Sequence, residues 1–480
     1  MSSDKLLYND DIAPAKKKDW GAWTLFGVWA SIAAPNSMLV GATGILLGFN
    51  WWQILLISLI GDLITLGPLI IQSHGAVVYG LAEPQLDRTR FGIWGTYIPS
   101  WVRLIIAMGF FGVQTFLVNE AVVGIMLELS GQISHIAGLA ALTPGLLAST
   151  YPSLFWTSFV VVIIFQVIIL LLAKPLLGSP SLKWLSRVTP VVSMVVLTLA
   201  TLYFVVRYPV GLESALKQPA APLSWAMLPM ILLFITANIH ATQIISWPDM
   251  MRFGKSFRSM LLGQVGLPVF YTIVATYGAI MAGISLALTK SVTYDPSLLV
   301  IKFVSPVIAV LMLTGFSYGL LMTNIFSNSV PPIYDLNNTF PSKLNWTRGV
   351  LIVTLLGIAM GVWSIYLKGA YVYFNTFVLI ISGLLGPIAG IIVADYVFIH
   401  KFKLDVGDIF KRKGKYTYYH GVNLVAVVAF VVPLLIVVAP PYLGITFPGS
   451  IYLYKASWIS GFLIAFAIYL PLSKVFKIGK

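Results

Sequence analysis

The chain has 480 residues, of which 58% are hydrophobic and only 10% are charged, with a formal net charge of +14 and a mean hydropathy of +0.91. An ordinary globular domain has roughly 25% charged residues, so these side chains are too few to cover a soluble particle of 52.6 kDa. The composition therefore excludes a cytosolic enzyme, a disordered chain and a nucleic-acid binder, and the absence of cysteine excludes disulfides and thiolate metal sites.

A polar segment of about 20 residues comes first. It lacks the apolar core and the cleavage site of a signal peptide, and we predict that it is a retained tail. Apolar runs of the ~20 residues needed to cross a bilayer then recur along the chain and predict an all-α integral membrane protein. The sequence contains about twelve such spans, at residues 22–47, 51–80, 98–128, 154–173, 187–206, 228–247, 260–288, 304–334, 349–367, 371–400, 422–441 and 456–473.

The basic residues indicate how these spans are oriented. If the N-terminus lies in the cytoplasm, 24 of the 30 lysine and arginine residues fall on the cytoplasmic side and 6 on the other side. Cytoplasmic loops of membrane proteins carry such an excess, so both termini are predicted to be cytoplasmic. The basic loop at residues 401–415 is interpreted as part of this signal, with contact to anionic lipid as the alternative.

Two predicted spans are interrupted near their centres. Span 1 contains Pro35, which breaks helical hydrogen bonding, and span 6 contains the polar segment 236–243 (Thr-Ala-Asn-Ile-His-Ala-Thr-Gln). One proline alone would be unremarkable in a membrane helix, but transporters built from inverted repeats bind substrate where helices break at corresponding positions of the two halves. The two centres lie about 204 residues apart. This spacing predicts that spans 6–10 repeat spans 1–5 and that a binding site lies between the breaks.

Other polar side chains lie inside predicted spans. In span 3, Phe110 precedes Gln114 by one turn on the same face, and a buried amide must find hydrogen-bond partners. Asp62 in span 2 and Glu120 in span 3 are ionisable groups within the membrane; either they mark a proton or ion pathway, or they form structural hydrogen bonds. Glu120 follows Gln114 by six residues, so it points away from the Gln114 face.

Motifs of an enzyme are missing from the sequence. It contains no phosphate-cradling glycine loop, no serine elbow and no histidine pair with metal-ligand spacing on one helix face. We therefore expect no enzymatic activity and no resident cofactor. A sensor would need a soluble domain, yet no loop exceeds about 30 residues. A channel would need a ring of pore-lining charges or a repeated filter segment, and neither appears in the sequence, which disfavours a channel.

Five segments carry more specific motifs. They are residues 8–14 (Tyr-Asn-Asp-Asp-Ile-Ala-Pro), 90–95 (Arg-Phe-Gly-Ile-Trp-Gly), 247–253 (Trp-Pro-Asp-Met-Met-Arg-Phe), 385–391 (Leu-Gly-Pro-Ile-Ala-Gly-Ile) and 413–418 (Lys-Gly-Lys-Tyr-Thr-Tyr). In this order they resemble the nucleobase–cation symport-1 family over nearly the whole chain. The resemblance implies a leucine-transporter-like fold of 5+5 inverted repeats plus two helices. Its expected parts are a tail at 1–21, repeats at 22–206 and 228–400, and two additional helices within 422–480.

The resemblance also implies a substrate site. The residues that match it are Pro35, Phe110, Gln114, Ile239, His240, Asn328 and Leu385. Phe110 and His240 are expected to sandwich a flat ring, while Gln114 and Asn328 bind its amide edge through paired hydrogen bonds. Leu385 is expected to close over the ligand. His240 departs from the tryptophan that is usual in the family, and Pro35 stands where the hydantoin carrier has glutamine.

A sodium site is implied in the same way. Its matching residues are Ser31, Ala34, Gly319, Met322 and Thr323. Met322 stands where the family has serine, and a thioether is a poor ligand for a hard cation. Two hypotheses follow for the co-transported ion. Either it is H+, taken up by Asp62, Glu120 or His240, which we favour, or it is Na+ at a rearranged site.

Together these observations predict a secondary active transporter of the cytoplasmic membrane. It would import a small planar nitrogen heterocycle, such as a nucleobase, hydantoin or allantoin, by cation-coupled alternating access. The alternatives are an amino acid or vitamin-amine permease of the same fold and, from another class, a membrane-bound sensor. We expect the substrate and membrane lipid as partners, no nucleic acid, and a monomeric protein.

Overall fold

The computed structural model describes residues 6–132, 142–173, 180–293, 295–369 and 372–478. Within these ranges every regular element is a helix, apart from two isolated bridges, Trp20 with Gly254 and Tyr419 with Val422. Eleven of the described helices are long and apolar enough to cross a membrane, and a bent pair at the start makes a twelfth span. The all-α membrane fold predicted from the sequence is confirmed.

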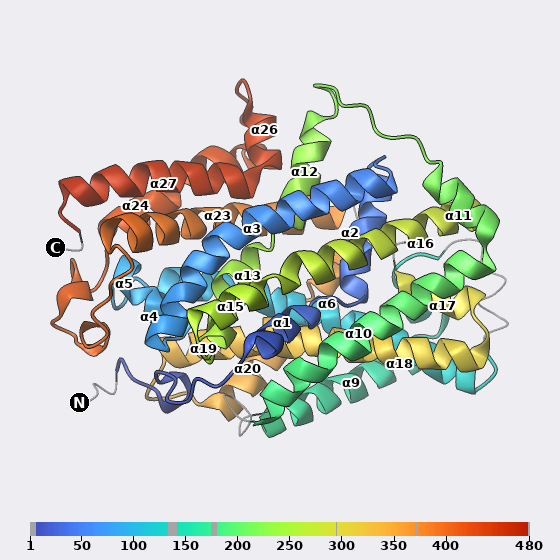
Figure 1. Ribbon diagram of the computed structural model, residues 1–480, viewed down its shortest axis with the longest axis horizontal. Coiled ribbons are helices and arrows are strands. Elements are labelled where there is room, and N and C mark those ends of the chain that lie inside the picture. The colour runs from blue at the N-terminus through green and yellow to red at the C-terminus, as the bar shows by residue number, and fades with distance from the viewer. Residues whose placement is uncertain (1–5, 133–141, 174–179, 294, 370–371, 479–480) are drawn as a thin grey trace.

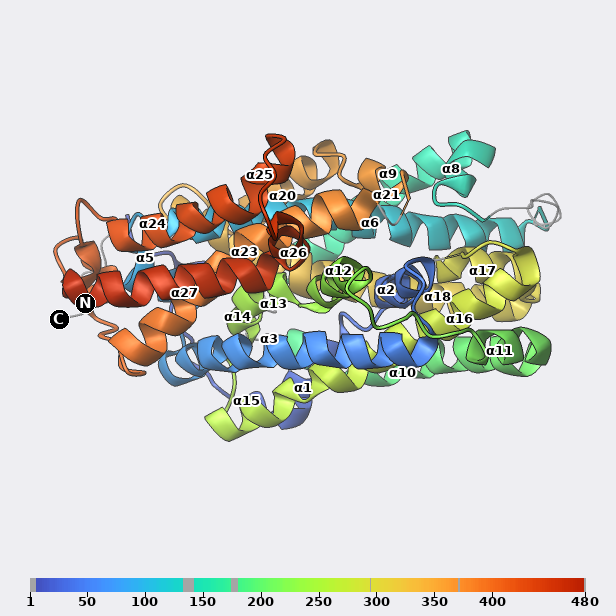
Figure 2. The same ribbon diagram turned by 90° about the horizontal axis from the view of Figure 1, so that it is seen from above.

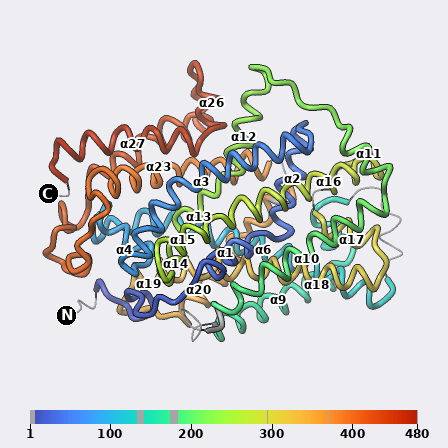
Figure 3. The backbone as a smooth tube through the Cα atoms, in the orientation of Figure 1, coloured from blue at the N-terminus to red at the C-terminus, as the bar shows by residue number. Residues whose placement is uncertain are grey.

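The first five spans precede residue 208. Span 1 consists of α1 (Ala22–Ala30) and α2 (Pro35–Leu46), whose axes differ by 55°, and Figure 3 shows the change of direction between them. The next four are α3 (Trp51–Tyr79), α6 (Tyr97–Leu129), α9 (Pro152–Ala173) and α10 (Pro180–Arg207). The short helices between or after them are α4 (Glu83–Leu86), α5 (Arg88–Phe91), α8 (Leu146–Thr150) and α11 (Pro209–Leu216).

The next five spans contain several π-helical segments. Span 6 is divided into α12 (Leu228–Asn238) and α13 (Ala241–Ser246). Span 7 is formed by α15 (Phe257–Gln264), η3 (Pro268–Thr272) and α16 (Ile273–Thr289), and span 8 by α18 (Pro306–Thr323), η4 (Asn324–Ser329) and α19 (Val330–Thr339). Spans 9 and 10 are α20 (Trp346–Ala359), then η5 (Tyr373–Val378), α23 (Leu379–Val393) and η6 (Ala394–Ile399). Short helices here are α14 (Pro248–Met251), α17 (Pro296–Phe303) and α21 (Trp363–Tyr366).

Two further spans complete the chain. Span 11 consists of α24 (Leu424–Pro433), η9 (Leu434–Val438) and α25 (Ala439–Tyr442), and span 12 is α27 (Ser457–Val475) after the short α26 (Ser450–Lys455). Single helical turns in the tail and loops are η1 (Asp10–Ile12), η7 (Asp408–Phe410) and η8 (Lys415–Thr417). The predicted spans match these helices to within a few residues at most ends. Span 8, which we predicted to end at 334, continues to Thr339 because its prolines fall in the first turn of α19, where a missing N–H costs nothing.

Most spans run side by side along the long axis of the molecule (Figures 1 and 2). The tail with η1, the loop with α4 and α5, and the end of α27 lie at one end, which we call the terminal end, while α11 and α17 lie at the other. Apolar side chains cover the outer faces of the spans: Ile164 is 54%, Val191 56% and Leu355 68% exposed. Such large apolar surfaces are expected where a protein faces lipid.

Candidate functional site

Both interruptions predicted from the sequence are breaks in the helices. Between α1 and α2, Ala34 is extended (φ −126°, ψ 175°), and Pro35 lies in the first turn of α2. Between α12 and α13, Ile239 is extended (φ −79°, ψ 121°), and His240 is the residue before α13. Each break frees backbone polar groups at membrane depth, which is tolerated only where they are buried in protein or face a cavity.

A cavity of about 160 Å³ lies between the two breaks. Its wall also includes parts of α6, η3, α18, η4, η5 and α23. The polar side chains in the wall are Asn36, Ser37, Thr43, Gln114, His240, Thr242, Gln243, Tyr271, Thr323, Ser327, Asn328, Tyr373 and Ser382. The rest of the wall is apolar, a composition typical of small-molecule sites.

Most of the substrate residues expected from the sequence meet at this cavity. Its wall contains Phe110, Gln114, Ile239, His240 and Asn328. The other two expected residues are not in the wall.

Pro35 and Leu385 lie beside the cavity instead. Pro35 contacts a smaller space that it shares with Asn36. Leu385 is only 1% exposed, within α23, and that helix presents Ile381 and Ser382 to the cavity one turn earlier. Helix α23 therefore reaches the site, but with side chains other than Leu385.

The two rings expected to hold the substrate each pack against another aromatic ring. The Phe110 and Phe377 ring centroids are 5.1 Å apart at an interplanar angle of 64°. The His240 ring packs edge-on against Tyr271, with centroids 4.0 Å apart and an angle of 86°. Sequence reasoning missed Tyr271 and Tyr373 because tyrosine within an apolar run resembles an ordinary core residue.

Gln114 and Asn328 each bring an amide group to the cavity wall. The Gln114 Oε1 atom is buried and has no hydrogen-bond partner within the described part of the chain. Asn328 Nδ2 donates to Asn324 Oδ1 at 2.9 Å, and Asn324 Nδ2 donates to Gln166 Oε1 at 2.7 Å. This chain of amides fixes the orientation of Asn328, whereas the unpaired Gln114 oxygen would gain a full hydrogen bond from a ligand N–H group.

Asp62 has a partner that the sequence did not reveal. Its carboxylate is 0% exposed, and its Oδ1 atom lies 3.1 Å from His240 Nε2. Thr272 Oγ1 donates to Asp62 Oδ2 at 2.7 Å, and the backbone N–H of His240 donates to Thr65 Oγ1 at 3.0 Å. The contact connects the middle of α3 to the break in span 6. The Asp62 carboxylate is therefore linked to the cavity wall by the His240 imidazole.

Glu120 is buried away from the cavity. Its Oε1 atom accepts a hydrogen bond from the backbone N–H of Gly145 at 3.1 Å, in the segment that precedes α8. This position agrees with the expectation that Glu120 points away from the Gln114 face.

The residues expected at a cation site converge beside the cavity. Thr323 Oγ1 donates to the Ser31 carbonyl at 2.5 Å and also lies 3.1 Å from the Gly319 carbonyl. A Cβ atom on Gly319 would lie 3.3 Å from the Cβ atom of Ala34, so the break in span 1 directly faces α18. The Ser31 hydroxyl donates to the Val28 carbonyl at 2.6 Å.

Met322 is buried in the same turn of α18 as Thr323. The oxygen atoms whose contacts converge here are the Ser31 and Gly319 carbonyls and the Thr323 hydroxyl, and Met322 brings no hydroxyl to this turn of α18.

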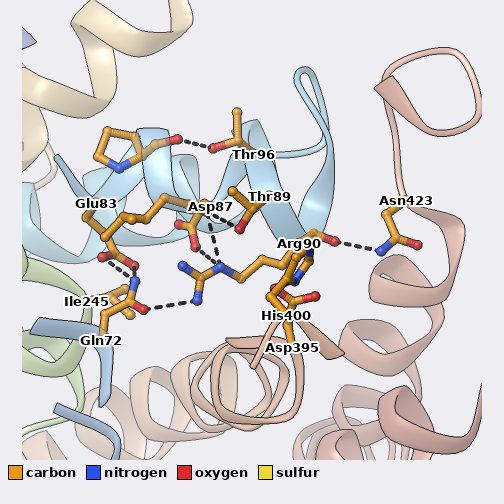
Figure 4. A network of polar contacts seen from close by, with 12 residues as sticks. Gln72, Glu83, Asp87, Thr89, Arg90, Thr96, Ile245, Asp395, His400 and Asn423 are labelled. Atoms are coloured by element: carbon orange, nitrogen blue, oxygen red, sulfur yellow. Dashed lines mark hydrogen bonds and ion pairs between the residues drawn. The ribbon is translucent and has the colours of Figure 1, made fainter. Parts of the chain in front are cut away.

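A second polar network, drawn in Figure 4, involves the loop with α4 and α5 at the terminal end, and its residues are not in the cavity wall. Gln72 Nε2 donates to the Glu83 carboxylate, and Arg90 Nη1 donates to Gln72 Oε1 at 3.0 Å. Arg90 Nε lies 3.3 Å from Asp87 Oδ1, and Asn423 Nδ2 donates to the Arg90 carbonyl at 2.7 Å. Burial raises the pKa of Asp87 to about 6. The network ties the loop after span 2 to α3 and to the start of span 11, which is a structural role.

Comparison with known proteins identifies the family. The model of the family described as permeases for cytosine/purines, uracil, thiamine and allantoin matches residues 12–461. The chain belongs to this family. It is therefore a membrane transport protein and not an enzyme, and the resemblance inferred from the five sequence motifs is confirmed.

Characterised relatives of this permease have several substrates. It is 30% identical to a purine-uracil permease of Arabidopsis thaliana, over 96% of this chain and 75% of the relative. It is 28% identical to an allantoin permease of Bacillus subtilis, over 98% and 94%. It is 23% identical to a hydantoin permease of Microbacterium maritypicum, over 89% and 83%.

Solved structures show the same fold. The permease is similar to the inward-facing conformation of Mhp1, with a TM-score of 0.74 and 20% identity over 98% of this chain and 94% of the other. It is also similar to the closed conformation of that nucleobase-cation-symport-1 family transporter with bromovinylhydantoin bound, with a TM-score of 0.73 and 21% identity over 98% and 96%. The leucine-transporter-like fold expected from the sequence is confirmed.

Proposed function

We propose that this permease imports a small planar nitrogen heterocycle of the nucleobase, hydantoin or allantoin type together with a cation. The observation that carries the proposal is the cavity between the two helix breaks, in which Phe110, Gln114 and Asn328 meet. Relatives named for uracil, allantoin and hydantoin support this substrate class.

The chemistry of the wall suits such a ring. Phe110 offers an apolar aromatic face against which a flat ring can pack. The Gln114 and Asn328 amides carry both donors and acceptors, and the lactam or ureide edge of a heterocycle carries the complementary set. A buried amide that is left unpaired costs roughly 1–3 kcal/mol, so rings lacking this edge would be rejected.

Alternating access follows from the position of the site at two broken helices. Helix halves on either side of a break can move separately, which opens the cavity first to one side of the membrane and then to the other. The cation would bind in one of two places. Na+ would use the oxygen atoms of Ser31, Gly319 and Thr323, and H+ would use a titratable group at the cavity.

We further propose that the protein is a monomer in the cytoplasmic membrane, surrounded by lipid, with both termini in the cytoplasm. The excess of basic residues in the loops on the N-terminal side supports this orientation. Residues 22–206 and 228–400 would be the two inverted repeats, preceded by a tail at 1–21 and followed by the two helices within 422–480. The breaks in spans 1 and 6, at corresponding positions, support this division.

Uptake by purified protein in liposomes tests the substrate class. Radiolabelled uracil, cytosine, hydantoin and allantoin are offered separately under an inward Na+ gradient, an inward proton gradient or neither, with protein-free liposomes as the control. We expect at least one ring to accumulate under one gradient. If none of the four rings accumulates under either gradient, the proposed substrate class is wrong.

A further inference from the structure

The contact between Asp62 and His240 brings a buried charge to the cavity wall. Asp62 is 0% exposed, and its carboxylate is bonded to His240 Nε2 at 3.1 Å and to the Thr272 hydroxyl at 2.7 Å. His240 is part of the cavity wall, and its second ring nitrogen, Nδ1, makes no hydrogen bond within the described residues. A ligand in the cavity would therefore meet the Nδ1 edge of a ring whose other edge is held by a carboxylate.

Counting protons shows what that edge presents. Without an added proton, the Asp62 carboxylate is only an acceptor, so the single ring hydrogen of His240 must sit on Nε2 and point toward it. Nδ1 is then a lone-pair acceptor. When the pair binds one proton, either the ring becomes an imidazolium or the carboxyl group is protonated and donates to Nε2. In both cases Nδ1 carries a hydrogen and is a donor.

We propose that Asp62 and His240 form one proton-binding site that converts the Nδ1 edge of His240 from a hydrogen-bond acceptor into a donor toward the transported ring. This proposal rests on the proposed function, and in it H+ is the coupling ion. The pair changes from a net charge of −1 to 0: the incoming proton binds Nδ1, and the hydrogen on Nε2 either stays on the ring or transfers to the Asp62 carboxylate. A substrate carbonyl oxygen accepts from Nδ1–H only in the protonated form, so proton and substrate each favour the binding of the other.

Among the described residues, the surroundings of Asp62 provide no countercharge other than His240. The titratable side chains that face the pair are Tyr271, whose ring centroid is 4.0 Å from that of His240, and Tyr373 in the cavity wall. Within the described ranges no lysine or arginine forms an ion pair with Asp62. The charged residues on the other elements packed against α3 are Glu83, Asp249, Arg258 and Asp395.

None of these four charged residues pairs with Asp62: three have other partners and one is exposed to the surroundings. Glu83 accepts from Gln72, Asp249 is paired with Arg103, Arg258 is exposed, and Asp395 accepts from Tyr469. Losing the proton therefore leaves an uncompensated charge inside the membrane, which is unfavourable. This cost favours the protonated pair whenever the cavity is sealed from water. The proton would leave when the cavity opens to a less acidic solution.

Nitrogen-15 NMR of the membrane-embedded protein tests the pair without any substrate. The chain has five histidines, and the His240→Gln variant assigns the His240 signals. At high pH we expect the tautomer with hydrogen on Nε2. In Asp62→Asn the preference for this tautomer should weaken, because the carboxylate that accepts the Nε2 hydrogen is gone. Glu120→Gln, which removes another buried carboxylate, is the matched control and should leave His240 unchanged. If the His240 signals are the same in Asp62→Asn and the wild type, the proposal is wrong.

Binding measurements test the coupling to substrate. Uracil and allantoin are titrated into detergent-solubilised protein between pH 5.5 and 8.5. We expect the affinity of the wild type to fall about 10-fold with rising pH, within the usual range of coupling between two ligands. His240→Gln, whose amide keeps a hydrogen bond but cannot titrate, should bind with the same affinity throughout, and Asp62→Asn, which lacks the carboxylate of the proton-binding pair, should lose most of the pH dependence. Glu120→Gln should behave as the wild type.

The two experiments separate the proposal from the proposed function. If neither uracil nor allantoin binds, the substrate class fails while the NMR arm still decides on the pair. A pH-dependent affinity that persists in both Asp62→Asn and His240→Gln overturns the proposal. So does an affinity of the wild type that is independent of pH.

Discussion

The wall of the cavity is built by side chains of one helix, such as Phe110 and Gln114, and by His240, whose partner Asp62 belongs to a different helix. Phe110 and Gln114 share a face by helical periodicity, and both line the cavity. Asp62 and His240 are 178 residues apart in sequence, and no local pattern connects them. The motif around Leu385 correctly locates α23 at the site. It does not predict how the helix is rotated about its axis, and Ile381 and Ser382 face the cavity in place of Leu385.

Gln114 is expected to be essential for transport. Gln114→Ala removes the amide whose oxygen is unpaired in the cavity and should weaken substrate binding by roughly 1–3 kcal/mol, about 5- to 150-fold. Uptake at low substrate concentration measures the effect. Gln132→Ala, which changes an exposed glutamine after the same helix, is the control. Normal uptake by Gln114→Ala would remove this residue from the site.

We expect Met322 to disfavour the binding of Na+ to the oxygen atoms beside the cavity. Met322→Ser adds a hydroxyl next to Thr323, whose own hydroxyl already contacts the Ser31 carbonyl. Because a hard cation prefers oxygen to a thioether, uptake by the variant should be stimulated several-fold more by sodium than uptake by the wild type. Met322→Leu, without an added oxygen, should show no gain. The same lack of gain in Met322→Ser would mean that this turn of α18 does not bind sodium.

At the scale of elements, apolar runs predict spans well, but they do not predict how closely two spans approach. The short helices α4, α8, α11, α17 and α26 were also not predicted, because each is shorter than two or three turns and has no clear periodicity. Close approach depends on small residues. Gly278 of α16 lies against α2 so tightly that a Cβ atom would be 2.1 Å from the Met38 carbonyl oxygen.

Gly278→Ala is therefore expected to destabilise the protein. The added methyl group must push α2 and α16 apart, and overpacking of this kind costs about 1–3 kcal/mol. Thermal unfolding in detergent should occur at a clearly lower temperature. At Gly67 of α3, by contrast, a Cβ atom would meet nothing within 4 Å, so Gly67→Ala should change the unfolding temperature little. Equal effects of the two substitutions would argue against close packing of α2 and α16.

In the molecule as a whole, one arginine connects spans 3, 6 and 8. Arg103 of α6 lies 2.6 Å from Asp335 of α19 and 2.9 Å from Asp249 of α14, and it also donates to the Ile245 carbonyl at the end of span 6. The sequence predicted the two breaks and their spacing, because a break leaves a local signal. It could not predict this bridge, because the two carboxylates are 146 and 232 residues away from Arg103.

The bridge is expected to hold the terminal end of the permease closed. Residues of α13 line the cavity, and α13 is followed by α14, which contains Asp249, so separating α14 from α6 would open the cavity toward the terminal end. Opening leaves charges without partners, and a buried ion pair that loses one member is destabilised by about 3–5 kcal/mol. In Arg103→Gln these ion pairs are already absent from the closed conformation, so opening no longer has to break them. The variant should therefore populate the conformation that is open at the terminal end more often than the wild type does.

Cysteine labelling measures this change cleanly, because the chain has no cysteine of its own. Thr242→Cys places a thiol in the cavity wall, and a membrane-impermeant maleimide is added from the side of the termini. Labelling should be faster when Arg103→Gln is also present, and Arg103→Lys, which keeps the charge but not the paired geometry, should give an intermediate rate. If Arg103→Gln unfolds at a lower temperature while the labelling rate stays the same, the bridge stabilises the fold without controlling access to the cavity.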